Sequence, residues 1–457
     1  MEGRYRAYPE YKESGVEWLG NVPTQWKLAE IKRFAQVQGG YAFDSSLFLD
    51  DGEPVIRIGD INQDGHISLN NCKCVSSTIA KKFQQFTVNT GELVMAMTGA
   101  TIGKAGWYKN ADPALVNQRV GIFKCDEKNL VYRYLWFLLS SSGYQEYIQL
   151  TAFGGAQPNI SDTGMVAYRT AIPNIPDQTQ IANFLDHETA KIDTLIEKQQ
   201  QLITLLQEKR QAVISHAVTR GLNPDAPMKD SGVEWLGEVP EHWVVSRYKF
   251  CTSRVVVGIA EAATHAYADN GVPLIRSTNI HEEGLNTSDL LYLKKHFADL
   301  NTSKYLYSND IVTVRTGYPG ISTVIPETLP QSQCFTNLIT TPTNKFNSYF
   351  LSEYLNSHTG KSYFKLLGWG SAQKNISVPI LQNIPIAYPE IEEQNKIVFH
   401  VLEQRNRFSN LIGKMKKQVD LLQERRTALI SAAVTGKIDV RDWKPTSSPS
   451  STSEALQ

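Results

Sequence analysis

The heptapeptide SGVEWLG occurs twice, at Ser14–Gly20 and at Ser231–Gly237, 217 residues apart. Each copy is followed by Val-Pro and then by a Trp three residues later, at Trp26 and Trp243. Nine of ten positions agree between the two decapeptides that begin with these motifs. A period of this size is that of a domain and excludes a solenoid. We therefore expect two similar domains, related by a pseudo-twofold axis, with two similar sites.

A second duplicated block predicts two long helices. LLQEKRQAVISHAVT at Leu205–Thr219 is repeated as LLQERRTALISAAVT at Leu421–Thr435, with 11 of 15 positions identical. The stretch from Gln178 to Thr219 contains no Gly or Pro. A coiled-coil seam at alternating three- and four-residue spacing is expected on both helices, and the economical partner for each helix is the other copy, packed antiparallel. The predicted seam positions are Leu185, Glu188, Ile192, Leu195, Gln199, Leu202, Leu206, Lys209 and Val213, with Val401, Gln404, Phe408, Leu411, Met415, Gln418, Leu422, Arg425 and Leu429 in the second copy.

The remaining part of each half has mixed character. Val- and Ile-rich runs bounded by turn residues predict strands at 54–61 and 91–99, which return at 273–280 and 309–317, and a further strand at the repeated AQ-x-NIS segment. Single helices are predicted at 131–148 and 348–364. The fold class is thus α+β, with two domains that are each followed by a long helix. The expected boundaries are domain 1 at 1–177, helix 1 at 178–221, a linker at 222–230, domain 2 at 231–391, helix 2 at 392–436, and a partly disordered tail at 437–457.

Composition excludes several classes of protein. The chain has 457 residues, a net charge of zero, 41% hydrophobic and 20% charged residues, which is ordinary for a globular protein. Any basic surface for nucleic acid must therefore be local. No apolar run reaches the ~18 residues of a membrane span and no signal peptide is seen, so a cytoplasmic protein is expected. Cys72 and Cys74 have no second pair at zinc-ligand spacing, so no metal site is expected and the five cysteines are interpreted as reduced structural thiols.

A search for catalytic motifs is negative. The string TGATIGKAG at Thr98–Gly106 resembles a phosphate loop, but only three residues separate Gly99 from Gly103, and Ala105 follows Lys104. It is either a tight loop between strands or a loop that approaches DNA, with Lys104 on a phosphate or base. Motifs for adenine methylation, for a serine nucleophile and for a zinc protease are also missing from the sequence. Framework residues are duplicated, whereas strand ends and loops differ, which is typical of one scaffold that presents two binding surfaces.

Candidate binding residues are chosen for groups that read base edges or hold phosphates. Arg57 and Arg276 occupy equivalent positions and can read guanine or hold a phosphate, although an ion pair with a nearby Asp is an equally open interpretation. Arg315 directly precedes Thr316 and Gly317, which repeat the Thr-Gly pair at 98–99; we call the loop that begins with each pair a TG loop. Tyr318 can stack, as can Tyr41. The predicted DNA-binding set is Arg57, Thr98, Lys104, Asn117, Gln118, Arg119, Arg276, Arg315, Tyr318, Gln331 and Gln333, with no catalytic and no metal-binding residue.

The ordered motifs resemble those of a known family. Two halves, each with SGVEWLG-x-VP-x-x-W, a TG loop, AQ-x-NIS and a long helix that ends in the duplicated block, are similar to the DNA specificity subunit of type I restriction–modification enzymes over about Tyr8 to Trp443. The resemblance implies two target recognition domains, each reading one half of a split, asymmetric site in double-stranded DNA, and two helices acting as a spacer. It also implies two docked modification subunits and additional restriction subunits. S-adenosylmethionine, ATP and Mg would bind to those partners, and this chain would have no cofactor and no catalytic activity.

Other functions remain open at this stage. An enzyme in its own right is disfavoured by the missing motifs, and methyl transfer by the isolated chain would revive it. A coiled-coil scaffold without DNA binding explains the helices but gives the two large domains no role. A nearer alternative is the specificity subunit of a system whose restriction and modification partners are fused.

Overall fold

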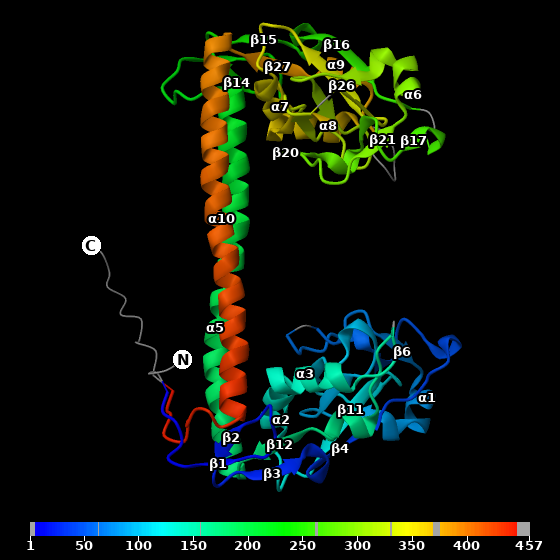
Figure 1. The fold of residues 1–457 in the computed structure, drawn as a ribbon, viewed down its shortest axis with the longest axis vertical. Coiled ribbons are helices and arrows are strands. Elements are labelled where there is room, and N and C mark those ends of the chain that lie inside the picture. The colour runs from blue at the N-terminus through cyan, green and yellow to red at the C-terminus, as the bar shows by residue number, and fades with distance from the viewer. Residues whose placement is uncertain are drawn as a thin grey trace, which may run out of the picture. The chain divides into compact units, whose positions relative to one another are not determined.

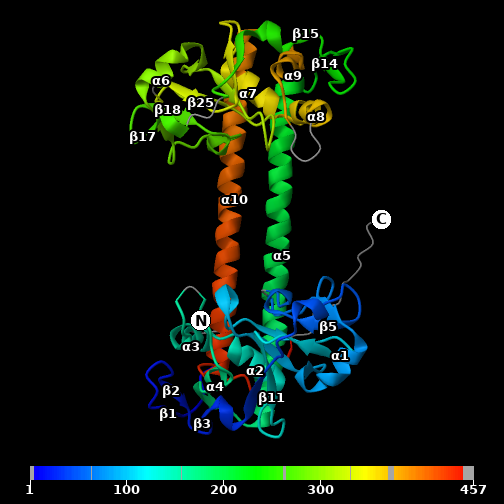
Figure 2. The same ribbon diagram turned by 90° about the vertical axis from the view of Figure 1, so that its right-hand side faces the viewer.

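The computed structural model describes residues 5–62, 64–155, 157–260, 264–329, 331–368 and 375–445. The chain divides into two units. Unit 1 combines Met1–Gln199 with Lys417–Gln457, and unit 2 is Gln200–Lys416. Each unit therefore contains one mixed domain together with a part of each of two long helices, α5 (Ile175–Arg220) and α10 (Ile391–Val434). The predicted α+β class with two long helices is confirmed, and both helices are visible in Figures 1 and 2.

The domain of unit 1 is built on two four-stranded sheets with the orders β6-β5-β10-β7 and β4-β11-β8-β9. Only β5 and β10 pair in parallel within these sheets, with Val55 opposite Leu115 and Ile56 opposite Val116. The strands are β4 (Ala35–Gly39), β5 (Glu53–Ile56), β6 (Lys73–Val75), β7 (Thr87–Val88), β8 (Leu93–Ala96), β9 (Ala105–Trp107), β10 (Ala114–Val116) and β11 (Val120–Cys125). Two strand pairs complete the unit: β1 (Tyr11–Glu13) with β2 (Asn21–Pro23), and β3 (Lys27–Glu30) with β12 (Arg169–Ile172). The short helices are α1 (Ser77–Lys82), α2 (Tyr132–Leu139), α3 (Ser142–Thr151) and α4 (Asp162–Val166).

Unit 2 repeats this topology. The sheet β16-β26-β23-β24 has the same order as β4-β11-β8-β9, and β21-β18-β25-β22 corresponds to β6-β5-β10-β7 with β17 added at its edge. The strands are β16 (Thr252–Val257), β17 (Tyr267–Ala268), β18 (Val272–Ile275), β21 (Leu291–Leu293), β22 (Tyr305–Leu306), β23 (Ile311–Thr313), β24 (Ser322–Val324), β25 (Ser332–Cys334) and β26 (Leu338–Pro342). Smaller pairs are β13 (Met228–Asp230) with β14 (Glu238–Pro240), β15 (Val244–Arg247) with β27 (Pro385–Tyr388), and β19 (Ile280–His281) with β20 (Gly284–Leu285). The short helices are α6 (Lys295–Leu300), α7 (Ser348–Asn356), α8 (His358–Leu367) and α9 (Val378–Gln382).

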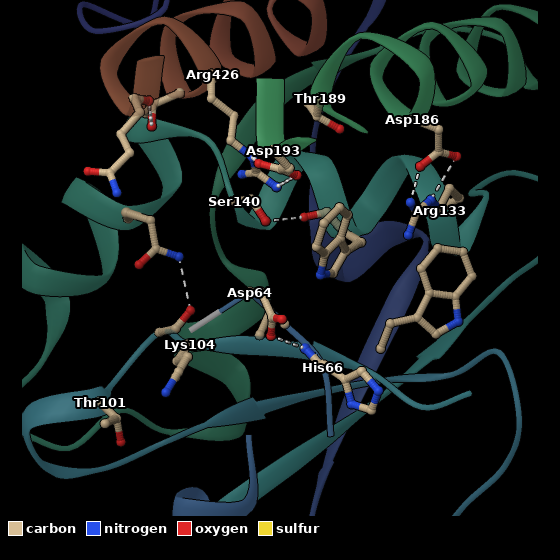
Figure 3. A pocket seen from close by; sticks show the side chains of 18 of the residues that line it. Asp64, His66, Thr101, Lys104, Arg133, Ser140, Asp186, Thr189, Asp193 and Arg426 are labelled. Atoms are coloured by element: carbon tan, nitrogen blue, oxygen red, sulfur yellow. Dashed lines mark hydrogen bonds and ion pairs between the residues drawn. The ribbon is translucent and has the colours of Figure 1, made fainter. Parts of the chain in front are cut away.

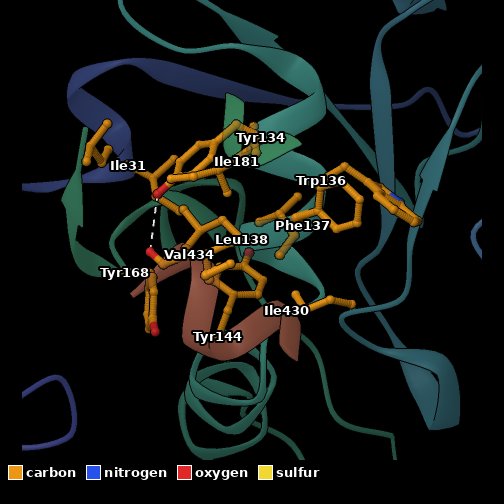
Figure 4. Packing of buried hydrophobic residues seen from close by; sticks show 14 of the residues in the cluster. Ile31, Tyr134, Trp136, Phe137, Leu138, Tyr144, Tyr168, Ile181, Ile430 and Val434 are labelled. Atoms are coloured by element: carbon orange, nitrogen blue, oxygen red, sulfur yellow. Dashed lines mark hydrogen bonds between the residues drawn. The ribbon is translucent and has the colours of Figure 1, made fainter. Parts of the chain in front are cut away.

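The core of unit 1 joins its domain to both long helices. Tyr134 and Leu138 of α2 pack in one buried cluster with Ile181 of α5 and with Ile430 and Val434 of α10 (Figure 4). The tyrosine hydroxyl donates to the Val434 carbonyl oxygen at 3.3 Å, so even this polar atom is satisfied. Since the beginning of α5 meets the end of α10, the two helices run antiparallel here. Unit 2 has the converse arrangement, because Ile214, Ala217 and Val218 of α5 share a core with Ile397 and Val401 of α10.

The predicted helix seam is right at its first three positions in α5, Leu185, Glu188 and Ile192, and beyond them every second predicted position is one residue off. Ile192 and Phe408 are buried as predicted, but Leu195 and Leu202 are exposed, and Ile203 is buried instead. The same one-residue shift in α10 buries Val419 and leaves Gln418 exposed. At 195–196 and 202–203 two apolar residues are adjacent, so a spacing of three and a spacing of four fit the pattern equally well there and periodicity alone could not choose between them.

Two further predictions are corrected by the structure. Each of the helices predicted at 131–148 and 348–364 is in fact two helices, because a serine interrupts each one. Ser141 and Ser357 are extended residues whose hydroxyls accept from the backbone N–H groups of Tyr144 and Gly360, as helix N-caps do. The AQ-x-NIS strand is also wrong. Asn159 makes only isolated bridges, and Ser161 then caps α4. Residues 156 and 371–374 of this motif, and residues 446–457 of the predicted disordered tail, lie outside the described residues.

Candidate nucleic-acid interface

In unit 1, several predicted residues meet at the carboxyl ends of the parallel strands β5 and β10. The Asn117 backbone N–H donates to the Ile56 carbonyl oxygen at 2.9 Å, which places Asn117 beside Arg57. The Met97 N–H donates to the Arg119 carbonyl oxygen at 2.9 Å, which adds Thr98 to the same edge. Gln118 and Arg119 are exposed. We call this the unit 1 edge: Arg57, Thr98, Asn117, Gln118 and Arg119.

The conformation of this edge depends on close backbone approach. Gly40 lies so near β10 that a Cβ atom there would be 2.3 Å from the Asn117 carbonyl oxygen, so no side chain fits. Tyr41 follows, and its backbone accepts from the Gln118 N–H at 3.0 Å. Its ring stacks on Phe83 with 4.0 Å between centroids, so Tyr41 packs within the domain.

Arg57 is held by a carboxylate, as one of the two sequence interpretations allowed. Its Nε is 3.3 Å from Asp60 Oδ2, and that oxygen also accepts the Arg57 backbone N–H at 2.8 Å. Both residues belong to the turn that contains a short 3-10 helix, η3 (Ile58–Asp60). The Arg57 side chain remains 39% exposed. An arginine oriented by an aspartate in this way can still offer its outer N–H groups to a base edge or a phosphate.

Lys104 lies apart from the unit 1 edge. The turn between β8 and β9 contains η5 (Gly99–Thr101), with Thr98 before it and Lys104 after it. Lys104 lines a cleft of about 910 Å³ between this turn and the two long helices. Arg133 pairs there with Asp186, and Arg426 pairs with Asp193 at 2.8 Å (Figure 3). The structure therefore separates Lys104 from the residues with which it was grouped.

The equivalent edge of unit 2 contains different residues from those predicted. The Phe335 N–H donates to the Ile275 carbonyl oxygen at 2.9 Å, and the Thr336 N–H donates to that of Ile259 at 2.9 Å. These bonds match those of Asn117 and Gln118, so Phe335 and Thr336 are their counterparts. Thr336 has a φ of 55°, a conformation that is uncommon for a threonine. We call Arg276, Arg315, Phe335 and Thr336 the unit 2 edge.

Two predicted residues of unit 2 are misplaced. Gln333 is completely buried, and its amide donates to the carbonyl oxygens of Ala298 and Asn301 at 3.0 and 3.1 Å. Burial leaves it no access to a base, so the prediction that Gln333 binds DNA is wrong. Gln331 is exposed but precedes β25, whereas Arg276 follows β18. Because β18 and β25 are parallel, the two residues lie at opposite ends of this strand pair.

The other predicted residues of unit 2 keep a place on this surface. Arg276 donates to Asp289 Oδ2 at 2.8 Å and to the Asp289 carbonyl oxygen at 2.7 Å. Arg315 follows β23 and accepts through its carbonyl oxygen from the Ile376 N–H at 3.1 Å. Tyr318 stands on the turn between β23 and β24 with 81% of its surface exposed. Sequence reasoning missed Phe335 and Thr336 because it chose amide side chains near the corresponding place, whereas the 218-residue offset between the two TG loops leads from Asn117 and Gln118 to Phe335 and Thr336.

Neither a metal centre nor an activated thiol is found among the described residues. No group of three or more His, Cys, Asp or Glu side chains in the described ranges is placed to hold a metal ion. Burial disfavours the thiolate and raises the pKa of Cys72 to about 11 and that of Cys125 to about 12. None of the helices in the part of the chain that the structure describes is long and apolar enough to cross a membrane.

Comparison with known proteins defines the class of this fold. A chain from a solved structure titled "Structural basis underlying complex assembly and conformational transition of the type I R-M system" superposes with a TM-score of 0.63. The alignment covers 90% of this chain and 98% of that one, at 14% identity. At this identity the likeness shows a common fold.

The sequence itself gives the family. The model of the family described as "Type I restriction modification DNA specificity domain" matches residues 23–205 and 262–420, and the chain belongs to this family. It is 23% identical over 450 residues to the MjaVIII specificity subunit of Methanocaldococcus jannaschii, covering 94% of this chain and 98% of the relative. It is 25% identical over 418 residues to the EcoBI specificity subunit of Escherichia coli, covering 89% and 84%. The family named from the sequence motifs is thereby confirmed.

Proposed function

We propose that this chain is a non-catalytic subunit that reads a split, asymmetric site in double-stranded DNA, one half with each unit. The observation that carries the proposal is the repeated edge at the ends of a parallel strand pair, with an arginine held by an aspartate in both units. The neighbouring side chains differ: an amide pair and Arg119 in unit 1, and Phe335 with Thr336 in unit 2. Amides and guanidinium groups recognise purines, whereas apolar groups contact the thymine methyl. Two different half-sites follow from this difference.

Equivalent exposed apolar residues support docking of two copies of one partner. Trp18 and Trp235 lie in the two SGVEWLG turns and expose 47% and 42% of their surfaces. Two more pairs are exposed at equivalent positions, Leu150 with Leu366 and Leu205 with Leu421. Exposed large side chains that recur in both copies of a repeat are typical of an interaction surface. We propose that a modification subunit docks on this set in each unit, with Trp18, Leu150 and Leu421 in unit 1.

The chemistry is proposed to belong to the partners. S-adenosylmethionine would bind to the modification subunits, and ATP and Mg to the restriction subunits, whether these are separate chains or fused. This chain would supply DNA recognition and the spacing of the two half-sites, set by α5 and α10. Because its target would be the DNA of the cell, we propose that it acts in the cytoplasm.

Mass measurement of the complex tests the proposal. Co-expressed with its modification subunit, the chain should form a complex with two modification subunits for each specificity subunit, and this complex should methylate DNA. Each component alone should transfer no methyl group to DNA. A complex that saturates at one to one, or methyl transfer by the isolated chain, would overturn the proposal.

A further inference from the structure

Equivalent arginines on the long helices have different partners in the two units. Arg426 of α10 is bonded by two N–H groups to Asp193 of α5, at 2.8 and 3.3 Å. Its counterpart, Arg210 of α5, lies 216 residues earlier in the second duplicated block. The residue equivalent to Asp193 is Ser409, which has no charge. Arg210 instead pairs with Glu283, with 2.7 Å between Nη1 and Oε1.

Glu283 stands at the tip of the β19–β20 hairpin of unit 2. The neighbouring residue, Glu282, is also paired across the unit, at 2.7 Å from Lys361 Nζ in the first turn of α8. Gly284 completes the turn with a φ of 141°, a conformation that L side chains rarely adopt. The two carboxylates thus fasten one hairpin to α5 and to α8. We call these two ion pairs the hairpin latch.

The hairpin latch is connected to the unit 2 edge by the backbone of the hairpin and by hydrogen bonds at its base. The buried amide of Asn279, directly before β19, donates to Asp289 Oδ1 at 2.8 Å. The other oxygen of Asp289 accepts from Arg276 Nη2 at 2.8 Å. Ile280 anchors the base of the hairpin in a buried cluster with Val312 and Ile339. One path therefore leads from Arg210 through the hairpin to the guanidinium of Arg276.

Unit 1 is built differently at this place. The corresponding hairpin, around the bridge between Ile61 and Ile67, packs its Gly65 against the Trp136 ring of α2. Asp64 lies at the tip of this hairpin and forms no ion pair with any described residue. Its carboxylate accepts from the backbone N–H of His66 at 2.9 Å. The cleft of about 910 Å³ lies beside this hairpin (Figure 3). Among the described residues, Arg57 is held by Asp60 of its own turn.

We propose that Glu282 and Glu283 are positioning residues. They hold the unit 2 edge against the helices of its own unit and thereby increase the discrimination between bases in one half-site only. The inference rests on the proposed function. Half-exposed ion pairs contribute modestly, so we expect a loss of discrimination of about fivefold and no loss of folding. Unit 1 has no such latch among its described residues, and its half-site should be unaffected.

A charge-exchange series in the full complex with the modification subunits tests this proposal. The variants are Glu283→Arg, Arg210→Glu and the two together, with Asp64→Asn as the matched hairpin control in unit 1. Methylation is measured at the cognate site and at sites with one base changed in either block. Each single variant should lose about fivefold in discrimination, in the same block and in that block alone. The double variant should recover, and Asp64→Asn should behave as the wild type.

Hydrogen exchange of the free chain tests the positioning role separately from the proposed function. The backbone N–H groups of 276–289 should exchange faster in both single variants and return to the wild-type rate in the double variant. The positioning role would be overturned if the single variants lost discrimination in both blocks or in neither. It would also be overturned if the double variant discriminated as poorly as the single variants. A wild-type complex that reads no split site would overturn the proposed function, whatever the exchange rates.

Discussion

Trp18 and Trp235 occupy the same place in the two SGVEWLG turns, and the ring of each contacts an aromatic ring of its own unit. The Trp18 ring stacks on Tyr168 with 4.5 Å between centroids, and the Trp235 ring is 5.9 Å from that of Tyr363. Each indole is thus held by the domain and still exposes nearly half of its surface. A large, preoriented aromatic side chain is the type of residue that dominates binding energy at interfaces.

This relationship predicts a stepwise loss of partners. Trp18→Ala and Trp235→Ala should each weaken one docking event by about 2 kcal/mol or more, as hot-spot truncations do. Native mass spectrometry near the dissociation constant should show one modification subunit retained by each single variant and none by the double variant. Leu300→Ala, at an exposed residue outside the repeated set, is the control. Retention of both partners by the double variant would contradict the proposed docking surface.

The corrected helix seam predicts unequal effects at adjacent positions. Ile203→Ala removes a buried side chain and should cost about 2–5 kcal/mol of folding free energy. Leu202→Ala removes an exposed one and should change the stability by no more than about 0.5 kcal/mol. Urea unfolding followed by the helical circular dichroism signal compares the two. Equal destabilisation by both substitutions would contradict a seam in which Ile203 is buried and Leu202 is exposed.

The composition of the unit 1 core predicts that the amino-terminal half forms dimers. Ile430, Ala433 and Val434 of α10 are buried in this core, and residues 1–227 lack them. The same half contains their counterparts at Ile214, Ala217 and Val218, which are identical residues. A second copy can therefore fill the gap, and residues 1–227 should sediment as a dimer. With modification subunits, this dimer should methylate a palindrome made of the first half-site. A folded monomer, or methylation of the native asymmetric site, would contradict the prediction.

Arg119 and Lys104 should differ in their effect on DNA binding. Arg119 lies on the unit 1 edge, so Arg119→Ala should cost about 1–3 kcal/mol and relax reading at one base pair. Lys104 lies in the cleft, and Lys104→Ala should weaken binding to all sequences alike and reduce the salt slope by about 1. Affinities measured over a range of salt concentrations, with cognate and altered sites, distinguish the two effects. A sequence-dependent loss on Lys104→Ala would place that side chain at a base.

Cysteines whose thiols have a raised pKa should resist alkylation. Desolvation raises the pKa of Cys72 to about 11 and that of Cys125, Cys251 and Cys334 to about 12. Because the thiolate is the nucleophile, these residues should remain protonated and react slowly with iodoacetamide at pH 8. The unfolded chain, with ordinary pKa values near 8.5, should react at all of its cysteines within the same time. Rapid labelling of Cys334 in the folded chain would contradict its burial.

The sequence predicted features that are repeated and local. Both long helices, the α+β class and the family follow from the duplicated blocks, because the same motifs recur in the same order. The breaks at Ser141 and Ser357 were missed, although each follows a serine or asparagine at the end of an apolar run, a signal for a cap. Gln333 was misassigned because its amide was matched to Asn117 and Gln118 by residue type, although the 218-residue offset between the two TG loops leads from these residues to Phe335 and Thr336. Gln333 instead lies within β25, where its side chain points to the interior.

Long-range partners were beyond the reach of pattern analysis. Arg210 and Glu283 are 73 residues apart, and neither motif nor periodicity connects them. The two sequence interpretations of Arg57 and Arg276 were equally open until the structure showed Asp60 and Asp289 at hydrogen-bond distance. Three-dimensional contacts also separated Lys104 from Thr98, six residues earlier, by folding the turn between them.

Mapping of methylated bases tests the central claim most directly. DNA from a host that expresses the chain with its modification subunits is sequenced for methylation, and DNA from a host without the chain is the control. We predict a motif of two short, different blocks separated by a spacer of fixed length, and no methylation of this motif in the control. A continuous motif, a palindrome from the full-length chain, or the same motif in both hosts would contradict reading of one half-site by each unit.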